Sequence, residues 1–293
     1  MPRALWMVLT LGLLGAELAA GQVQRPRSRD YLFASSADDA RALWVNPGGL
    51  HVVTEASVLA EVTLDRPLGG SLRLGQLAVG FNSRGISFGY QRDRLPDDPG
   101  TPEAEGRSAE AFRFGAGFWV PRGGVGIAVT FHRTGIEGRG SQRSIDLGAR
   151  YALLPTVDAG AVVRNIGRPA LQFAAGEEPI EGVIALSWLV LPSRLLVAAE
   201  GHAVERLAES GFDLAYRGGM HLSIGGPLGL GAVAAVDLGG NFLIDAWTVG
   251  LAVGGVDRVL GLVSGIPTTG GSAHLERFSL SGIASRRAPG RSP

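Results

Sequence analysis

Apolar and polar side chains alternate along most of the chain after residue 55. In one stretch Phe112, Phe114 and Phe118 alternate with Arg113, Gly115 and Gly117. A period of two residues places the apolar side chains on one face of a β-strand and the small or charged ones on the other. The pattern recurs and predicts about fourteen strands, near residues 56–64, 71–81, 85–92, 111–120, 124–132, 143–153, 156–166, 181–190, 194–204, 212–223, 228–237, 243–252, 257–264 and 274–284.

The links between these predicted strands alternate in length. Asn82–Arg84 and Pro121–Gly123 are tight, whereas Asp93–Glu110 and Gly167–Ile180 are long. Outer-membrane barrels have short periplasmic turns and longer external loops, and their strands run up and down around the ring. The sequence therefore predicts an all-β fold, a closed antiparallel up-and-down transmembrane β-barrel of about fourteen strands, located in the bacterial outer membrane with both ends on the periplasmic side.

A secreted, soluble β-sandwich that binds ligands or proteins would show the same two-residue period. Alternation says that one face is apolar, but not whether that face contacts lipid or a protein core. The alternating links favour lipid, and so does the composition of the opposite face, where glycine and scattered charges stand in place of continuous polar side chains.

The first 54 residues differ from the rest of the chain. Arg3 is followed by the apolar run Ala4–Gly15 and by small residues at Ala19–Gly21, which predicts a cleavable signal peptide over residues 1–21. Residues 22–54 then form a periplasmic or plug segment, with a short helix over Ala34–Leu43 that the following Asn-Pro-Gly-Gly must end. The barrel is expected over residues 55–285, followed by a basic tail over 286–293.

Composition excludes several kinds of partner and cofactor. The chain has 27 basic and 27 acidic residues, so no net charge attracts it to nucleic acid. It has no cysteine, which excludes disulfides and thiolate metal sites. We therefore expect no cofactor, and we expect outer-membrane lipid as the principal partner. The 45 glycines suit a narrow lumen that accommodates a plug.

Charged residues on the predicted inward face are the candidate site. They carry both signs and suit an ion-paired or hydrated barrel interior; they are Arg113, Asp146, Arg150, Asp158, Arg164, Glu200, His202, Arg217 and Asp237. Glu200 and His202 share a face and offer a weaker alternative, an acid/base pair. The chain lacks the Gly-x-Ser-x-Gly pattern of a nucleophile elbow, and we expect neither an enzyme nor a catalytic residue. The acidic residues of Asp93–Glu105 lack the ordered spacing of a calcium loop.

Three stretches carry a family resemblance. They are Ala40–Leu50, which contains Asn46, Pro47, Gly48, Gly49 and Leu50; Asp146–Gly167; and His274–Ser281. Together they resemble the PorV/PorQ-like branch of the long-chain fatty-acid-transporter outer-membrane superfamily, with Gly48 where that superfamily's N-terminal signature has alanine. The resemblance implies a roughly fourteen-stranded barrel whose N-terminal segment enters the lumen as a plug.

The resemblance also implies two possible functions for a non-enzymatic, porin-like barrel. One is a PorV/PorQ-type role in outer-membrane transport or protein secretion, with proteins of the type nine secretion machinery as partners. The other is a channel for hydrophobic small molecules, which would then be its ligands. The chain is short for a fatty-acid transporter, and it ends in Arg286–Pro293 without a terminal aromatic residue.

Overall fold

The barrel consists of long strands, each about as long as a membrane crossing requires. The computed structural model describes residues 31–51, 54–66, 70–94, 108–133, 142–169, 178–191, 194–206, 210–225, 228–254, 258–267 and 273–287. Within those ranges fourteen strands are present: β1 (Thr54–Asp65), β2 (Arg73–Ser83), β3 (Ile86–Arg94), β4 (Ser108–Val120), β5 (Gly123–Arg133), β6 (Gln142–Leu154), β7 (Val157–Ile166), β8 (Glu181–Leu191), β9 (Leu195–Glu205), β10 (Phe212–Gly225), β11 (Leu230–Leu238), β12 (Ile244–Val253), β13 (Arg258–Pro267) and β14 (Ala273–Arg287). The predicted signal peptide lies outside the described residues.

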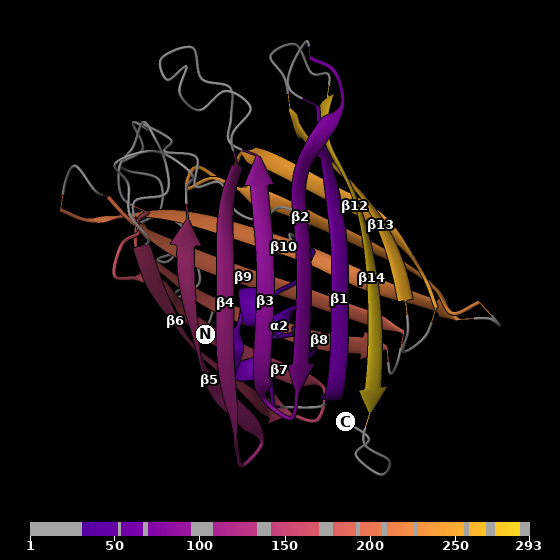
Figure 1. Cartoon of the computed structure of the whole chain (residues 1–293). Helices are drawn as coiled ribbons and strands as arrows, with labels where there is room; N and C mark the ends of the chain where they lie inside the picture. Colours follow the sequence, from indigo (N-terminus) through magenta and orange to yellow (C-terminus); the bar gives the residue numbers. More distant parts are fainter. Residues whose placement is uncertain are drawn as a thin grey trace, which may run out of the picture.

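Each strand pairs antiparallel with its neighbour in the sequence, and the last pairs with the first. Leu59 of β1 is opposite Ile283 of β14, which closes the ring (Figure 1). Closure pairs the backbone of every strand on both sides, as hydrocarbon requires. The predicted closed up-and-down barrel is confirmed, and the β-sandwich alternative is wrong. β14 continues to Arg287, so the first two residues of the predicted tail belong to the barrel.

Links of different length lie at the two ends of the barrel. Between β2 and β3, Arg84 and Gly85 both have positive φ, 49° and 89°, as a tight two-residue hairpin turn requires. By contrast, β3 ends at Arg94 and β4 begins only at Ser108. The short links lie at the same end as the start of β1 and the end of β14. By the rule for outer-membrane barrels, this is the periplasmic end, and the long links are external.

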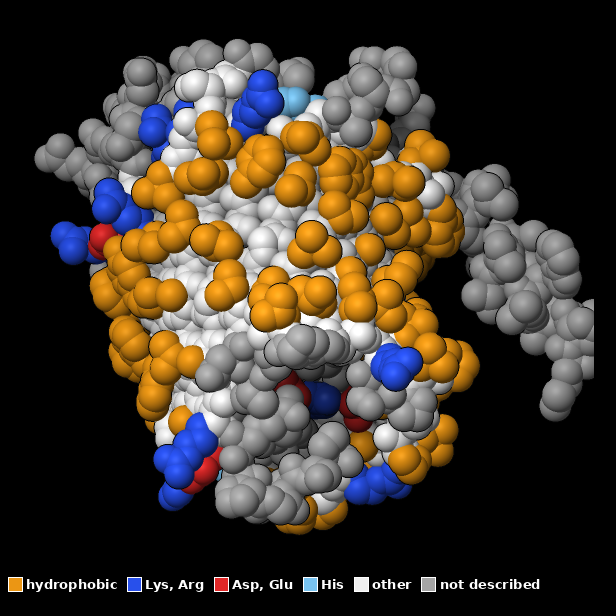
Figure 2. Space-filling model, turned by 90° about the vertical axis from the view of Figure 1, so that its right-hand side faces the viewer, with side chains coloured by type: hydrophobic (Ala, Val, Ile, Leu, Met, Phe, Trp, Pro, Cys, Tyr) orange, Lys and Arg blue, Asp and Glu red, His pale blue; other side chains and the backbone are white. Residues whose placement is uncertain are grey.

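The outward face of the wall is an apolar belt. Phe114 of β4 is 49% exposed and Ile184 of β8 is 72% exposed, although both lie in the middle of their strands. Figure 2 shows hydrophobic side chains over the broad middle of one face, with charged side chains near its margins. Such a belt around a closed ring of strands is stable only in a membrane, and the chain is an outer-membrane barrel.

The N-terminal segment, residues 31–51, lies inside the ring. Its α-helix α2 covers only Ala42–Val45, and a 3-10 turn η2 follows at Pro47–Gly49. The helix predicted over Ala34–Leu43 is therefore wrong: the segment reaches Ala42 through turns, such as the one closed by the bond from the Ala37 amide to the carbonyl oxygen of Phe33, while the Ala34 amide donates to Glu200 of the wall. No helix in the described part of the chain is long and apolar enough to span a membrane.

Candidate functional site

Glycines on the inward face make room for the N-terminal segment. A Cβ atom on Gly148 would lie 2.1 Å from Asn46 Oδ1, and one on Gly126 would lie 2.2 Å from the carbonyl oxygen of Pro47. Neither position has space for any side chain larger than hydrogen, so the segment packs directly on the backbone of the strands. Further inward glycines that contact the segment are Gly80, Gly89, Gly115, Gly117, Gly160 and Gly219.

Asn46 is the most extensively bonded residue of the segment. Its Nδ2 atom donates to the carbonyl oxygens of Ala34, at 2.6 Å, and of Ala149 in β6, at 2.8 Å. Its Oδ1 atom accepts from the Gly48 amide at 2.9 Å and caps the turn η2. Asn46 is fully buried, so these bonds satisfy an amide that would otherwise be costly to desolvate. One side chain thus joins the start of the segment, its end and the wall.

Residues 47–50 of the motif pack closely against their surroundings. Pro47 begins the 3-10 turn, where its missing N–H costs nothing. A Cβ on Gly48 would lie 2.7 Å from Ala149 Cα, and one on Gly49 would lie 2.0 Å from the carbonyl oxygen of Ala37. Leu50 accepts a 3.0 Å bond from Asn82 Nδ2 of β2. The motif therefore needs its two glycines for close approach.

Inward arginines donate to backbone carbonyls of the segment. Arg113 of β4 donates to Leu43 at 3.2 Å, and Arg164 of β7 donates to Val45 at 2.7 Å. These two carbonyls belong to α2, whose last carbonyls have no partner within the helix. Arg150 of β6 makes a longer bond, 3.4 Å, to the carbonyl oxygen of Ala37. The wall thus holds the segment by its main chain.

Each of these arginines is also paired with a carboxylate of the wall. The pairs and their closest distances are Arg113–Asp146 at 3.1 Å, Arg150–Asp158 at 2.9 Å and Arg164–Glu181 at 2.9 Å. A guanidinium has five N–H donors, so it bonds a carboxylate and a carbonyl at once. The ion pairs therefore orient the donors that face the segment.

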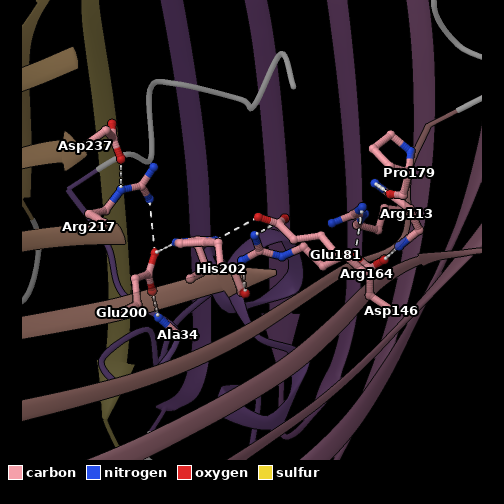
Figure 3. Close-up of polar contacts among 12 residues, drawn as sticks. Ala34, Arg113, Asp146, Arg164, Pro179, Glu181, Glu200, His202, Arg217 and Asp237 are labelled. Carbon is pink, nitrogen blue, oxygen red and sulfur yellow. Dashed lines mark hydrogen bonds and ion pairs between the residues drawn. The ribbon is translucent and has the colours of Figure 1, made fainter. Parts of the chain in front are cut away.

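His202 of β9 joins two of the wall's carboxylates. Its Nδ1 lies 2.7 Å from Glu181 Oε1 and its Nε2 lies 2.9 Å from Glu200 Oε1 (Figure 3). The other oxygen of Glu200 accepts a 3.0 Å bond from the Ala34 amide of the segment. The imidazole is 1% exposed, and both its nitrogens are occupied. This geometry suits a structural connection, not the acid/base pair that was the weaker sequence hypothesis.

Arg217 of β10 extends the network across the wall. It donates to Glu200 at 3.3 Å and to Asp237 of β11 at 2.6 Å. Figure 3 shows the resulting line of polar contacts from Asp237 through Glu200 and His202 to Arg164. All nine charged residues predicted for the inward face lie on the luminal side of their strands. Eight of them contact one another, and Arg164 pairs instead with Glu181, which the sequence analysis did not include.

A second group of polar residues lies within the segment itself. Arg41 forms a 2.6 Å ion pair with Asp39 and donates to the hydroxyl of Tyr31. Burial alone would raise the pKa of the Asp39 carboxyl, but the Arg41 guanidinium beside it outweighs burial and holds the pKa below its usual value. Sequence reasoning missed this group. The neighbouring Trp44 is buried, and its ring lies over Gly80 and Gly89.

The remaining side of the lumen is largely apolar in its middle. Val233 of β11, Ala252 of β12, and Leu260 and Leu262 of β13 form one buried cluster, against which Tyr31 packs. The same inward row of β13 also carries Arg258, whose guanidinium is close enough to Asp39 of the segment to help lower the pKa of that carboxyl, but no described hydrogen bond joins the two. Among the described residues, no group of three histidine, aspartate or glutamate side chains is placed to hold a metal ion.

The comparisons with known proteins show likeness in fold alone. No protein-family profile and no curated protein sequence matches the chain. Among solved structures, the CymD monoaromatic hydrocarbon channel gives a TM-score of 0.59 at 13% identity, covering 90% of this chain and 98% of that chain. A Pseudomonas aeruginosa FadL homologue gives a TM-score of 0.50 at 10% identity, covering 86% and 95%.

Proposed function

We propose that the chain is a channel through which hydrophobic small molecules cross the outer membrane, and that residues 31–51 act as its plug. The observation that carries this proposal is the unequal attachment of the segment. Its backbone is hydrogen-bonded to β2, β4, β6, β7 and β9, whereas β11–β13 face it mainly with apolar side chains, and Arg258 of β13 makes no described hydrogen bond to it.

A path along the apolar side would suit an uncharged solute. The cluster of Val233, Ala252, Leu260 and Leu262 presents no charge, and the contacts there are non-directional. A small shift of Tyr31 away from this cluster would break no hydrogen bond to the wall. A hydrophobic molecule would replace the contacts that Tyr31 gives up, whereas a sugar or an ion would have to lose its hydration.

The fold likeness supports the same proposal. The CymD structure, which is called a channel for monoaromatic hydrocarbons, has a similar barrel, with a TM-score of 0.59. The PorV/PorQ-type role in protein secretion rests on the resemblance of three motifs alone. No contact in the described residues favours it over passage of small molecules.

Deletion of Ala34–Leu50 tests whether the segment is a plug. We expect the single-channel conductance in planar bilayers to rise, because the deletion removes the structure that fills the polar side of the lumen. Uptake of a radiolabelled monoaromatic hydrocarbon into vesicles should rise as well. Conductance equal to that of the full chain would contradict the plug.

A separate measurement on the full chain tests whether the transported solutes are hydrophobic. Vesicles that contain the protein should take up the hydrocarbon faster than vesicles without it, while uptake of arabinose should stay the same. Equal acceleration of both solutes would contradict a hydrophobic route, whatever the deletion shows.

A further inference from the structure

Arginines gather on the outward face of β3–β6 at the end with the long links. Arg92 of β3, Arg133 of β5 and Arg143 of β6 are exposed and belong to the outward-facing rows of their strands. Arg92 is opposite Glu110 of β4, which in turn is opposite Arg133, and Arg143 is opposite Phe131. At about 4.8 Å between strands and about 3.4 Å per residue along them, the Cα atoms of these arginines lie within about 16 Å of one another.

One carboxylate, Glu110, lies between these three arginines in the strand register, so the group keeps a net positive charge. Within the described ranges, neither Arg133 nor Arg143 has a hydrogen bond or ion pair, and Arg92 donates only to the hydroxyl of Ser108. Glu110 accepts a bond from the Tyr90 hydroxyl at 3.1 Å. Two other arginines at this end of the barrel are ion-paired: Arg168 with Glu205, and Arg206 with Asp213 at 2.7 Å.

Aromatic side chains lie directly below the arginines on the same outward face. Tyr90 packs on Phe112, with ring centroids 5.2 Å apart, and Phe114 packs edge-on against Phe131 at 6.1 Å. This surface is part of the apolar belt and contacts acyl chains. The arginines therefore lie at the level where hydrocarbon gives way to headgroups in the external leaflet.

We propose that the outward face of β3–β6 binds a phosphorylated glycolipid of the external leaflet, the arginines holding its phosphates and the aromatic cluster its acyl chains. Guanidinium groups bind phosphate oxygens in a two-point geometry, and such contacts are strong at a low-dielectric boundary. An acidic protein partner would fit the arginines, but it would leave the aromatic cluster below them unused. This proposal needs the membrane orientation of the barrel and is independent of what crosses the lumen.

Purified lipid A with two phosphates is the probe, and native mass spectrometry of the detergent-solubilised full chain measures its binding. We expect enzymatic removal of the phosphates to weaken binding at least tenfold. The double variant R133Q/R143Q should bind about 25-fold more weakly, because each cation near a charged lipid surface is worth about fivefold. Both lost arginines are exposed, so the barrel should fold; circular dichroism checks this.

The matched control is R168Q/R206Q, which removes two arginines from the same end of the barrel that are already ion-paired. Its affinity for lipid A should change less than twofold. Equal losses in the two double variants would overturn the proposal, as would equal binding of phosphorylated and dephosphorylated lipid A. Binding of phosphatidylglycerol as tight as that of lipid A would overturn the assignment to a glycolipid.

Discussion

The two sides of the luminal wall contact the N-terminal segment in different ways. On β2, β4, β6, β7 and β9, side chains and backbone groups bond individual atoms of the segment, as Glu200 bonds the Ala34 amide. On β11–β13, Leu260 and Leu262 only pack. Hydrogen bonds depend on angle and break abruptly, whereas apolar contacts tolerate sliding. The polar side therefore determines where the segment lies, and the apolar side leaves a direction in which it can move.

The largest expected effect comes from breaking the polar side at its centre. Glu200→Gln removes a buried charge that pairs with Arg217 and faces His202, so Arg217 keeps only the partly exposed Asp237 as its carboxylate partner. We expect a loss of about 3 kcal/mol in the free energy of unfolding. Urea unfolding in lipid vesicles measures this loss.

Asp213→Asn is the control for this prediction, because the Asp213–Arg206 pair is exposed. Its cost should stay below about 1 kcal/mol. Protease digestion should also cut the N-terminal segment faster in Glu200→Gln than in the control. Equal stability of the two variants would show that the buried network does not hold the segment.

A substitution on the apolar side should lower the stability of the barrel without changing the position of the N-terminal segment. Leu262→Ala leaves a cavity, and we expect a loss of about 2 kcal/mol in the free energy of unfolding. Because Leu262 makes no directional bond to the segment, protease resistance of residues 31–51 should not change. Faster digestion of the segment would show that the apolar side also determines its position.

The smallest expected effect concerns the inward-facing glycines on which the N-terminal segment packs. In Gly148→Ala the added methyl group would overlap Asn46 Oδ1, and relief of this overlap should cost about 1–2 kcal/mol in the free energy of unfolding. In Gly261→Ala the methyl group meets no described atom within 4 Å. A difference of less than about 0.5 kcal/mol between the two in urea unfolding would contradict close packing of the motif on β6.

The fold was predictable because each strand carries its own signal. Phe112 and Arg113 take opposite sides of β4 simply because they are adjacent in a strand, and the same holds for every inward charge. Link length, as at Ser83–Ile86 and Arg94–Ser108, then gave the up-and-down order. These signals depend only on residues that are close together in the sequence, and not on which residues lie across the barrel.

The contacts between the N-terminal segment and the barrel wall could not be predicted in detail, because the residues that bond the segment are distant from it in the sequence. Asn46 bonds Ala149, and Arg164 bonds Val45, which are separations of 103 and 119 residues. A helix over Ala34–Leu43 was expected from local pattern, whereas the Ala34 amide donates to Glu200 of β9, and the Ala34 carbonyl oxygen accepts from Asn46 instead of from a later amide of a helix. The inward charges were visible in the sequence, but not which carboxylate each arginine would meet.

Pairing of the first strand with the last constrains how the protein assembles. Thr54–Asp65 can complete its hydrogen bonds only when Ala273–Arg287 arrives, more than two hundred residues later in synthesis. Until then two unsatisfied edges are exposed, which favours aggregation and requires protection during export. Since residues 31–51 precede the first strand at the periplasmic mouth, they can enter the lumen after the ring has closed, without threading through the wall.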